Sequence, residues 1–169
     1  MTAGPEPPWR APGEGVAGGP VYAQPVLLRR DDLLIVARDV VAYPWALGFS
    51  PHLMWPGGER WPGGPWSRDW DAPPERGDLR VWVERADGVR VEEAGPRPGE
   101  TADPPEAPIL IPRGGRGEVD WVQDYWLWPA PPPGDVVLGV WWPDRDVPES
   151  RATITARQMD AARGRIIDP

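Results

Sequence analysis

Two runs of aromatic and β-branched residues near the C-terminal end constrain the fold most. The first covers residues 118–128 (EVDWVQDYWLW) and the second covers residues 136–142 (VVLGVWW). Residues of these types suit the pleated, half-buried surface of a β-sheet. The connection between the runs, PAPPPGD, is so rich in proline that it cannot be helical. The sequence therefore predicts a β-hairpin made of two aromatic strands.

Short alternating segments recur along the rest of the chain, separated by turn residues. An Asp-Gly dipeptide at residues 87–88, for example, supplies the positive φ angles that tight hairpins need. No long segment has the 3.6-residue apolar period of a helix. The pattern predicts an all-β fold: a single antiparallel β-sandwich, immunoglobulin-like, with about seven to nine short strands and long loops rich in Pro, Gly and Trp. A small barrel is the alternative.

Three local features refine this prediction. Pro51 interrupts the alternating segment 47–55, which indicates an edge strand or a bulge because proline cannot donate to the ladder. Residues 113–117 (RGGRG) are expected to form a flexible turn after a short strand at 108–111. Residues 158–163 have the composition of one or two helical turns.

Composition divides the chain into three parts. Half of residues 1–20 are Pro or Gly, and this segment is predicted to be a disordered tail. Residues 21–160 hold the alternating segments and form the predicted β-sandwich domain. Residues 161–169 are expected to be a C-terminal tail.

The charge and the missing residue types exclude several functions. A net charge of −8 weighs against nucleic acid and against anionic membranes, because both are bound by basic surfaces. No apolar stretch approaches the roughly 18 residues of a membrane span, and the N-terminus lacks the pattern of a signal peptide. We therefore expect a cytoplasmic protein. The chain has no Cys and no Lys, which excludes thiolate metal sites and lysine chemistry. No cofactor and no metal are predicted.

The most unusual local feature is a tryptophan-rich loop over residues 55–70, in which WPGG occurs twice. Large rigid aromatic side chains dominate interaction hot spots and can stack on sugars, proline-rich peptides or cations. The loop therefore predicts a partner surface. The alternative, which the pattern favours, is that the loop folds back as a lid over the sandwich. The residues predicted to form the surface are Trp55, Trp61, Trp66 and Trp70.

A second aromatic cluster follows from the alternation of residues 125–128. Trp126 and Trp128 point to the face opposite Tyr125 and Leu127, so aromatic side chains lie on both faces of this strand. One face is core. The other is either covered by the chain's own loops, which is the favoured interpretation, or open as a surface for a protein partner or a second copy.

Polar residues offer only weak signals for chemistry. Glu118 and Asp120 are close enough along a strand for paired carboxylates of a hydrolase, with Asp124 further along the same face. His52 and Ser50 share a face, but no third member of a catalytic triad is indicated. A solvated strand surface explains these residues better.

Two further polar segments have similarly simple explanations. Asp144, Asp146 and Glu149 could offer oxygen ligands to calcium, but their spacing matches no full calcium-binding loop. Arg113 and Arg116 could hold an anion, although no helix follows to supply oriented amide groups. A polar turn and a hairpin connection are the preferred interpretations.

Four segments have a distinctive pattern: residues 43–55 (YPWALGFSPHLMW), 79–88 (LRVWVERADG), 108–117 (PILIPRGGRG) and 125–156 (YWLWPAPPPGDVVLGVWWPDRDVPESRATITA). Together they resemble a family of small, uncharacterised cytosolic proteins of high-GC actinobacteria. The last is the most specific, with a W-x-W-P strand end, a proline-rich turn and a second strand that ends in W-P. The resemblance covers about residues 20–160. It implies an all-β domain and no particular activity.

These observations lead to two functional hypotheses. The first is a non-enzymatic binding or protein-interaction module that uses tryptophan side chains to bind a protein partner or a second copy of the chain. The alternative is a hydrolase that acts on glycans or esters through carboxylates. The first is preferred because no catalytic motif is present.

Overall fold

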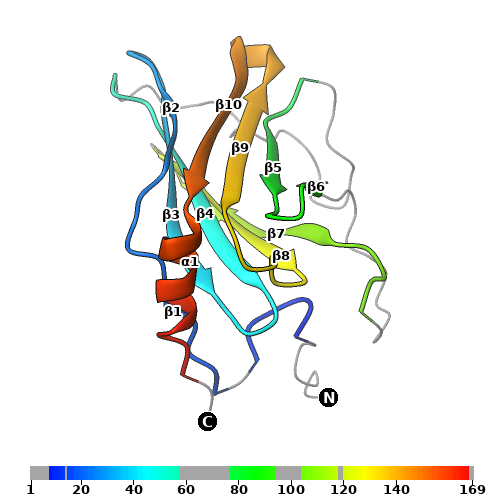
Figure 1. The fold of residues 1–169 in the computed structure, drawn as a ribbon. Coiled ribbons are helices and arrows are strands. Elements are labelled where there is room, and N and C mark those ends of the chain that lie inside the picture. The colour runs from blue at the N-terminus through cyan, green and yellow to red at the C-terminus, as the bar shows by residue number, and fades with distance from the viewer. Residues whose placement is uncertain (1–7, 14, 58–76, 94–103, 118–119, 168–169) are drawn as a thin grey trace, which may run out of the picture.

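The computed structural model describes residues 8–13, 15–57, 77–93, 104–117 and 120–167. These residues form two antiparallel β-sheets packed face to face and one short α-helix (Figure 1). The predicted all-β sandwich is confirmed, and the alternative of a barrel is not. Within the described residues, no helix has the length and apolar character that crossing a membrane requires.

The larger sheet has the strand order β1-β3-β4-β8-β7, with β2 also paired to β3. The smaller sheet has the order β10-β9-β5-β6. The strands of the larger sheet are β1 (Gly19–Pro20), β2 (Val26–Arg29), β3 (Leu34–Ala42), β4 (Leu47–Met54), β7 (Ile109–Arg116) and β8 (Trp121–Trp128). Those of the smaller sheet are β5 (Arg80–Glu84), β6 (Arg90–Glu92), β9 (Val136–Trp142) and β10 (Val147–Ile154).

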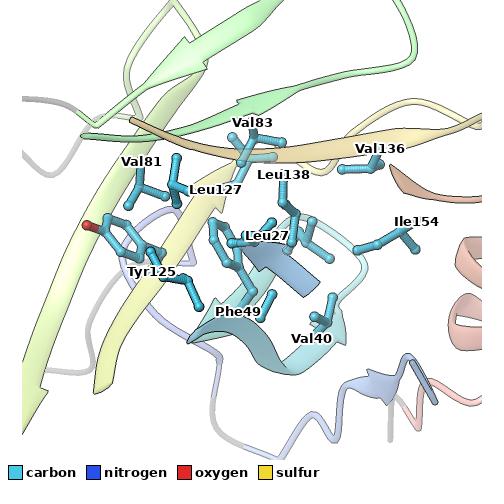
Figure 2. Packing of buried hydrophobic residues seen from close by; sticks show 14 of the residues in the cluster. Leu27, Val40, Phe49, Val81, Val83, Tyr125, Leu127, Val136, Leu138 and Ile154 are labelled. Atoms are coloured by element: carbon cyan, nitrogen blue, oxygen red, sulfur yellow. The ribbon is translucent and has the colours of Figure 1, made fainter. Parts of the chain in front are cut away.

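The core lies between the two sheets and is built from the alternate residues of their strands (Figure 2). On β9 every second residue is buried, as alternation along a strand requires: Val136, Leu138, Val140 and Trp142. From the larger sheet, Tyr125 of β8 stacks on Phe49 of β4 with 5.5 Å between ring centroids. The predicted period of two is therefore confirmed on both sides of the sandwich.

The predicted hairpin of residues 118–142 is wrong, because its two strands belong to different sheets. β8 pairs with β4 and β7, whereas β9 pairs with β5 and β10. The proline-rich connection crosses from one sheet to the other, a gap of about 10 Å in sandwiches. It is fixed there by a hydrogen bond from the Ala130 amide to the Trp45 carbonyl (2.6 Å) and by one from Arg163 to the Pro131 carbonyl (2.8 Å).

Pro51 lies on β4, a central strand, so the edge-strand alternative of the prediction is wrong; a register shift of the bulge type does occur in the β3–β4 pair, between Arg38 and Val41, next to the pair Ala37↔Pro51. The amide of Ala37, the neighbour of Pro51 on β3, points away from β4 and donates to Pro25. The missing N–H of Pro51 therefore faces β8. The β4–β8 register runs from Phe49↔Tyr125 to His52↔Val122 with no shift and no pair at Pro51. A central strand tolerates this proline at the cost of one interruption in one ladder.

The segment predicted as a flexible turn at residues 113–117 is in strand conformation up to Arg116. β7 continues to Arg116 and pairs with β8 after a register shift between Pro112 and Gly114. The shift adds a residue to one strand, as in a β-bulge. Gly and Arg thus extend a strand because the neighbouring β8 supplies a ladder that the local sequence does not reveal.

Both ends of the chain differ from the predicted tails where they are described. Residues 19–20 form β1 and pair with β3, and the helix α1 (Ala156–Arg163) buries Met159 and Ala162. A capping box between Thr155 and Gln158 starts this helix. Residues 158–163 are therefore helical as predicted. The two ends meet where Ala17 and Ile167 exchange backbone hydrogen bonds of 2.9 Å.

Candidate functional site

An apolar cluster on the outer face of the larger sheet is the candidate site. Its centre is Trp126, which projects from β8 away from the core because Tyr125 and Leu127 project into it. The Trp126 indole lies over Gly48 of β4 and has its ring centroid 4.8 Å from that of Tyr43. We call this set the outer aromatic cluster: Tyr43, Trp45, Ala46, Ile109, Ile111, Trp126 and Trp128.

A tight turn between β3 and β4 forms one side of the outer aromatic cluster. The Tyr43 amide donates to the Ala46 carbonyl over 2.9 Å, which closes the turn and sets Tyr43 and Trp45 beside the sheet. Burial raises the pKa of the Tyr43 phenol, and the charge of Arg113 opposes that shift. Strand β7 forms the opposite side, with Ile109 and Ile111 beside Trp128 and Trp126 in the register.

The chain's own N-terminal segment, residues 8–13 (PWRAPG), covers this cluster. Trp9 is only 2% exposed and packs with Ala46, Ile111 and Trp126. Ala11 is also buried, whereas Pro8 and Pro12 face solvent. The Arg113 guanidinium of β7 donates a hydrogen bond to the backbone carbonyl of Arg10. A proline-rich peptide therefore lies on an aromatic surface, with alternate residues turned inward.

The cluster contains two buried indole N–H groups without an acceptor among the described residues. They are Nε1 of Trp45 and Nε1 of Trp126. A buried donor that loses its water and gains no partner costs about 1 to 3 kcal/mol. The N-terminal segment thus fills the apolar volume of the cluster without satisfying all of its polar atoms.

The structure brings two of the predicted surface residues together and separates the others. Trp126 and Trp128 are both in the outer aromatic cluster, and the cover over Trp126 is the N-terminal segment. Trp55 packs elsewhere, against the main core, beside a hollow that Arg30 and Arg145 also line. Trp61, Trp66 and Trp70 lie outside the described residues.

The carboxylates of the alternative hydrolase hypothesis occupy an ordinary strand surface where they are described. Asp124 accepts hydrogen bonds from Ser50 Oγ (2.7 Å) and from Arg116 Nη1 (3.0 Å). Asp120 is exposed, and Glu118 lies outside the described residues. Asp124 therefore serves as the acceptor that satisfies buried Ser50 in the structure.

His52 shares the outer face with Ser50, but the hydrogen-bond order of a catalytic triad is absent. Ser50 donates directly to Asp124, whereas in a triad the histidine stands between serine and carboxylate. Burial lowers the pKa of His52, and the positive charges of Arg38 and Arg116 lower it further. Asp39 and Asp120 act in the opposite direction.

The acidic segment around Asp144 forms a turn. A 3-10 helix (Pro143–Arg145) is followed by Asp146 with a φ of 51°, and Val147 then begins β10. No three acidic or histidine residues in the described ranges lie close enough together to hold a metal ion.

Trp9 and Arg113 belong to this site, although no pattern in the sequence predicted them there. Trp9 is a single large aromatic residue in a segment of prolines and glycines, and its composition pointed to a tail. The signal in the sequence was a tryptophan within a proline- and glycine-rich segment, together with a strand that carries tryptophans on its outer face. Arg113 could not be found because its role depends on β7 continuing past Pro112.

Comparison with known proteins gave no relative. No family model matches the sequence, and no curated protein or solved structure matches it either.

Proposed function

We propose that the protein is a non-enzymatic interaction module whose outer aromatic cluster binds a tryptophan-bearing, proline-rich segment of a partner protein. The N-terminal segment acts as an intramolecular occupant that the partner replaces. The observation that carries the proposal is the burial of Trp9 against Trp126, Ile111 and Ala46, on the outer face of the sheet rather than in the core.

The chemistry of the contact is that of peptide recognition. Residues 8–10 form a turn with a bend at Ala11, and the flanking prolines limit the conformations of the free segment, so binding orders it at a reduced cost in entropy. Tryptophan side chains carry a large share of the free energy in such interfaces. Arg113 adds a hydrogen bond to a backbone carbonyl, which any peptide sequence can accept.

Because the N-terminal segment is covalently attached to the site that it occupies, it lowers the apparent affinity of every partner that competes with it. Covalent attachment gives this occupant a high effective concentration at the site, so a partner must bind more tightly than the N-terminal segment does. A partner that also supplied an acceptor to the indole N–H of Trp45 or Trp126 would gain what the N-terminal segment lacks. The N-terminal segment thus sets the minimum affinity that a partner needs in order to displace it.

The test is a change in the occupant that leaves the site intact. In the full chain, Trp9→Ala removes the buried indole, and a capped synthetic peptide of residues 7–13 (PPWRAPG) serves as the probe. We expect calorimetry to show that the peptide binds Trp9→Ala about tenfold or more tightly than the wild-type chain, because the tethered competitor is gone. Trp141→Ala is the matched control, since Trp141 is 42% exposed on the other sheet.

A folded Trp9→Ala chain that does not bind the peptide, or binds it no better than the wild type, would contradict the proposal. Loss of Trp9 costs about 3 kcal/mol or more of stability, so folding is checked by circular dichroism. Gly13→Val is the second variant, because Gly13 lies against Trp45 and belongs to the occupant. Light scattering shows whether a second copy, rather than a partner, supplies the occupant.

A further inference from the structure

We infer that the outer face of the smaller sheet carries a second binding site, which takes a neutral sugar ring against the exposed indole of Trp141. This site is separate from the outer aromatic cluster, because that cluster lies on the outer face of the larger sheet. The inference therefore does not depend on the proposed function.

Trp141 differs from the other tryptophans of the smaller sheet in being open to solvent. Its exposed fraction is 42%, whereas Trp82 and Trp142 are buried. Trp142 points into the core, so alternation along β9 turns Trp141 to the outer face. The next outer position on β9, Gly139, is covered by the Trp82 ring. The Trp141 indole is thus outside the core and keeps apolar surface on which a ligand can lie.

A hollow of about 350 Å³ lies beside this indole. Its walls come from four strands: Arg80 of β5, Arg90 and Glu92 of β6, Trp141 of β9 and Glu149 of β10. Small-molecule sites range from about 300 to 1,000 Å³, so this hollow suits one ring or two rather than a long segment of chain. Because every wall is part of the sheet, the site has a rigid frame.

The charged groups around Arg90 are held in fixed positions. The Arg90 guanidinium stacks on Trp82, 4.1 Å from the ring centroid. Its Nη1 donates to both carboxylate oxygens of Glu149, over 3.0 and 3.1 Å, and its Nε lies 3.2 Å from Oε1 of Glu92. These contacts span the sheet from β6 to β10. Both carboxylates are oriented before a ligand arrives, which reduces the entropy lost on binding.

The two carboxylates keep acceptor capacity after binding Arg90. A carboxylate has about four lone-pair sites, and the Arg90 contacts use only some of them on each group. Oε2 of Glu92 has no hydrogen-bond partner among the described residues. Hydroxyl groups of a ligand in the hollow can therefore donate to Glu92 and Glu149.

The balance of charge in the hollow selects a neutral ligand. Its lining holds two guanidinium groups, Arg80 and Arg90, and two carboxylates, Glu92 and Glu149. A cation or a phosphate group would meet like charges there, and the net charge of −8 further disfavours phosphate. A sugar hydroxyl donates to carboxylates and accepts from guanidinium groups. The C–H groups on one face of a pyranose ring pack on the electron-rich face of an indole. A neutral sugar thus matches both the ring and the charges.

The test measures sugar binding to the full-length chain by saturation-transfer NMR. The probes are cellotriose, maltotriose, mannotriose, galactotriose, xylotriose and chitotriose. We expect at least one of them to bind with a Kd of about 1 mM or tighter, with the strongest saturation on its ring C–H protons. Trp141→Ala should weaken that sugar about tenfold, and Trp141→Tyr by less than about threefold, because an aromatic ring remains. Circular dichroism checks the folding of both variants.

Glu92→Gln and Glu84→Gln form a matched pair. Both carboxylates project from the outer face of the smaller sheet, but only Glu92 lines the hollow. Glu92→Gln should weaken the sugar about threefold or more, because a charge-assisted hydrogen bond becomes a neutral one. Glu84→Gln should leave the affinity unchanged. Equal effects of the two substitutions would overturn the role given to Glu92.

Three results would overturn the site itself. The first is that no probe sugar binds the wild-type chain. The second is sugar binding that folded Trp141→Ala retains in full, which would place the sugar elsewhere. The third is that choline or guanosine binds through Trp141 while no sugar does, which would assign the hollow to a cation or a base. None of these results concerns the peptide site, because PPWRAPG should bind Trp9→Ala equally well whether or not Trp141 is also replaced.

Discussion

At the scale of single residues, close approach between backbone and ring fixes the outer face of the smaller sheet. Trp82 of β5 is 1% exposed although it points away from the core, and it lies directly over Gly139 of β9. The Arg90 guanidinium stacks on the other side of the ring, 4.1 Å from its centroid, and is held by Glu149 and Glu92. The indole is thus enclosed between a glycine and a cation.

Gly139→Ala is expected to destabilise the protein by about 1 to 3 kcal/mol, as overpacking does. A Cβ atom at this position would lie 2.0 Å from the Trp82 ring, so the indole and Arg90 above it must both move. Urea unfolding measures the effect. Gly114→Ala is the control, because a Cβ there has no neighbour within 4 Å. Equal midpoints for the two variants would refute this packing.

The charge state of His52 makes a second prediction at this scale. Its pKa is lowered in the fold by burial and by Arg38, whereas in the unfolded chain it has the ordinary value near 6.5. Between those two values the unfolded chain binds more protons, so the free energy of unfolding rises with pH and levels off above about 6.5. His52→Gln should remove that part of the pH dependence.

The measurement for His52 is a proton NMR titration of the ring, which is unambiguous because the chain has one histidine. The midpoint should fall below the ordinary value. A midpoint at or above it would mean that the surrounding carboxylates, Asp39 and Asp120, outweigh burial and the arginines.

At the scale of elements, a buried hydrogen bond joins the two sheets. The Tyr125 hydroxyl of β8 donates to Glu93, immediately after β6, over 2.9 Å, and both residues are buried. Glu93 also bridges Leu110 of β7 through its backbone. This contact fixes one side of the smaller sheet against the larger one.

Tyr125→Phe is expected to lower the free energy of unfolding by about 1 to 3 kcal/mol, because it removes a donor from a buried carboxylate. The ring and its stacking on Phe49 are kept. Tyr22→Phe is the matched control, since Tyr22 is 78% exposed. If both variants unfold at the same denaturant concentration, the hydrogen bond contributes nothing to joining the sheets.

The alternation of apolar and polar residues predicted which segments form strands, but not which strands pair with one another. Faces of β8 and β9 could be read from the sequence because the side-chain period is local. Their assignment to different sheets could not, since a hairpin and a sheet crossing both join two half-buried strands. Pro51 shows the same limit: its cost depends on which neighbour its missing N–H faces, and that is a property of the whole sheet.

At the scale of the whole molecule, the candidate site was half predictable. Alternation placed Trp126 and Trp128 on an outer face, and coverage by the chain itself was the favoured interpretation. The identity of the cover was not predictable, because proline and glycine in residues 8–13 indicate a lack of regular structure, and docking on a distant surface requires none. The composition of residues 8–13 thus predicted that the segment lacks regular structure, but not that it lies on the outer aromatic cluster.

The meeting of Ala17 with Ile167, and of Gly19 with the carbonyl of Ala162, has a consequence for how the protein is made. A ribosome synthesises Gly19 first and Ala162 some 140 residues later, so the earliest strand waits for the last helix before its packing is complete. Nascent chains halted before residue 156 should therefore leave that strand open to proteases, however well the rest has formed.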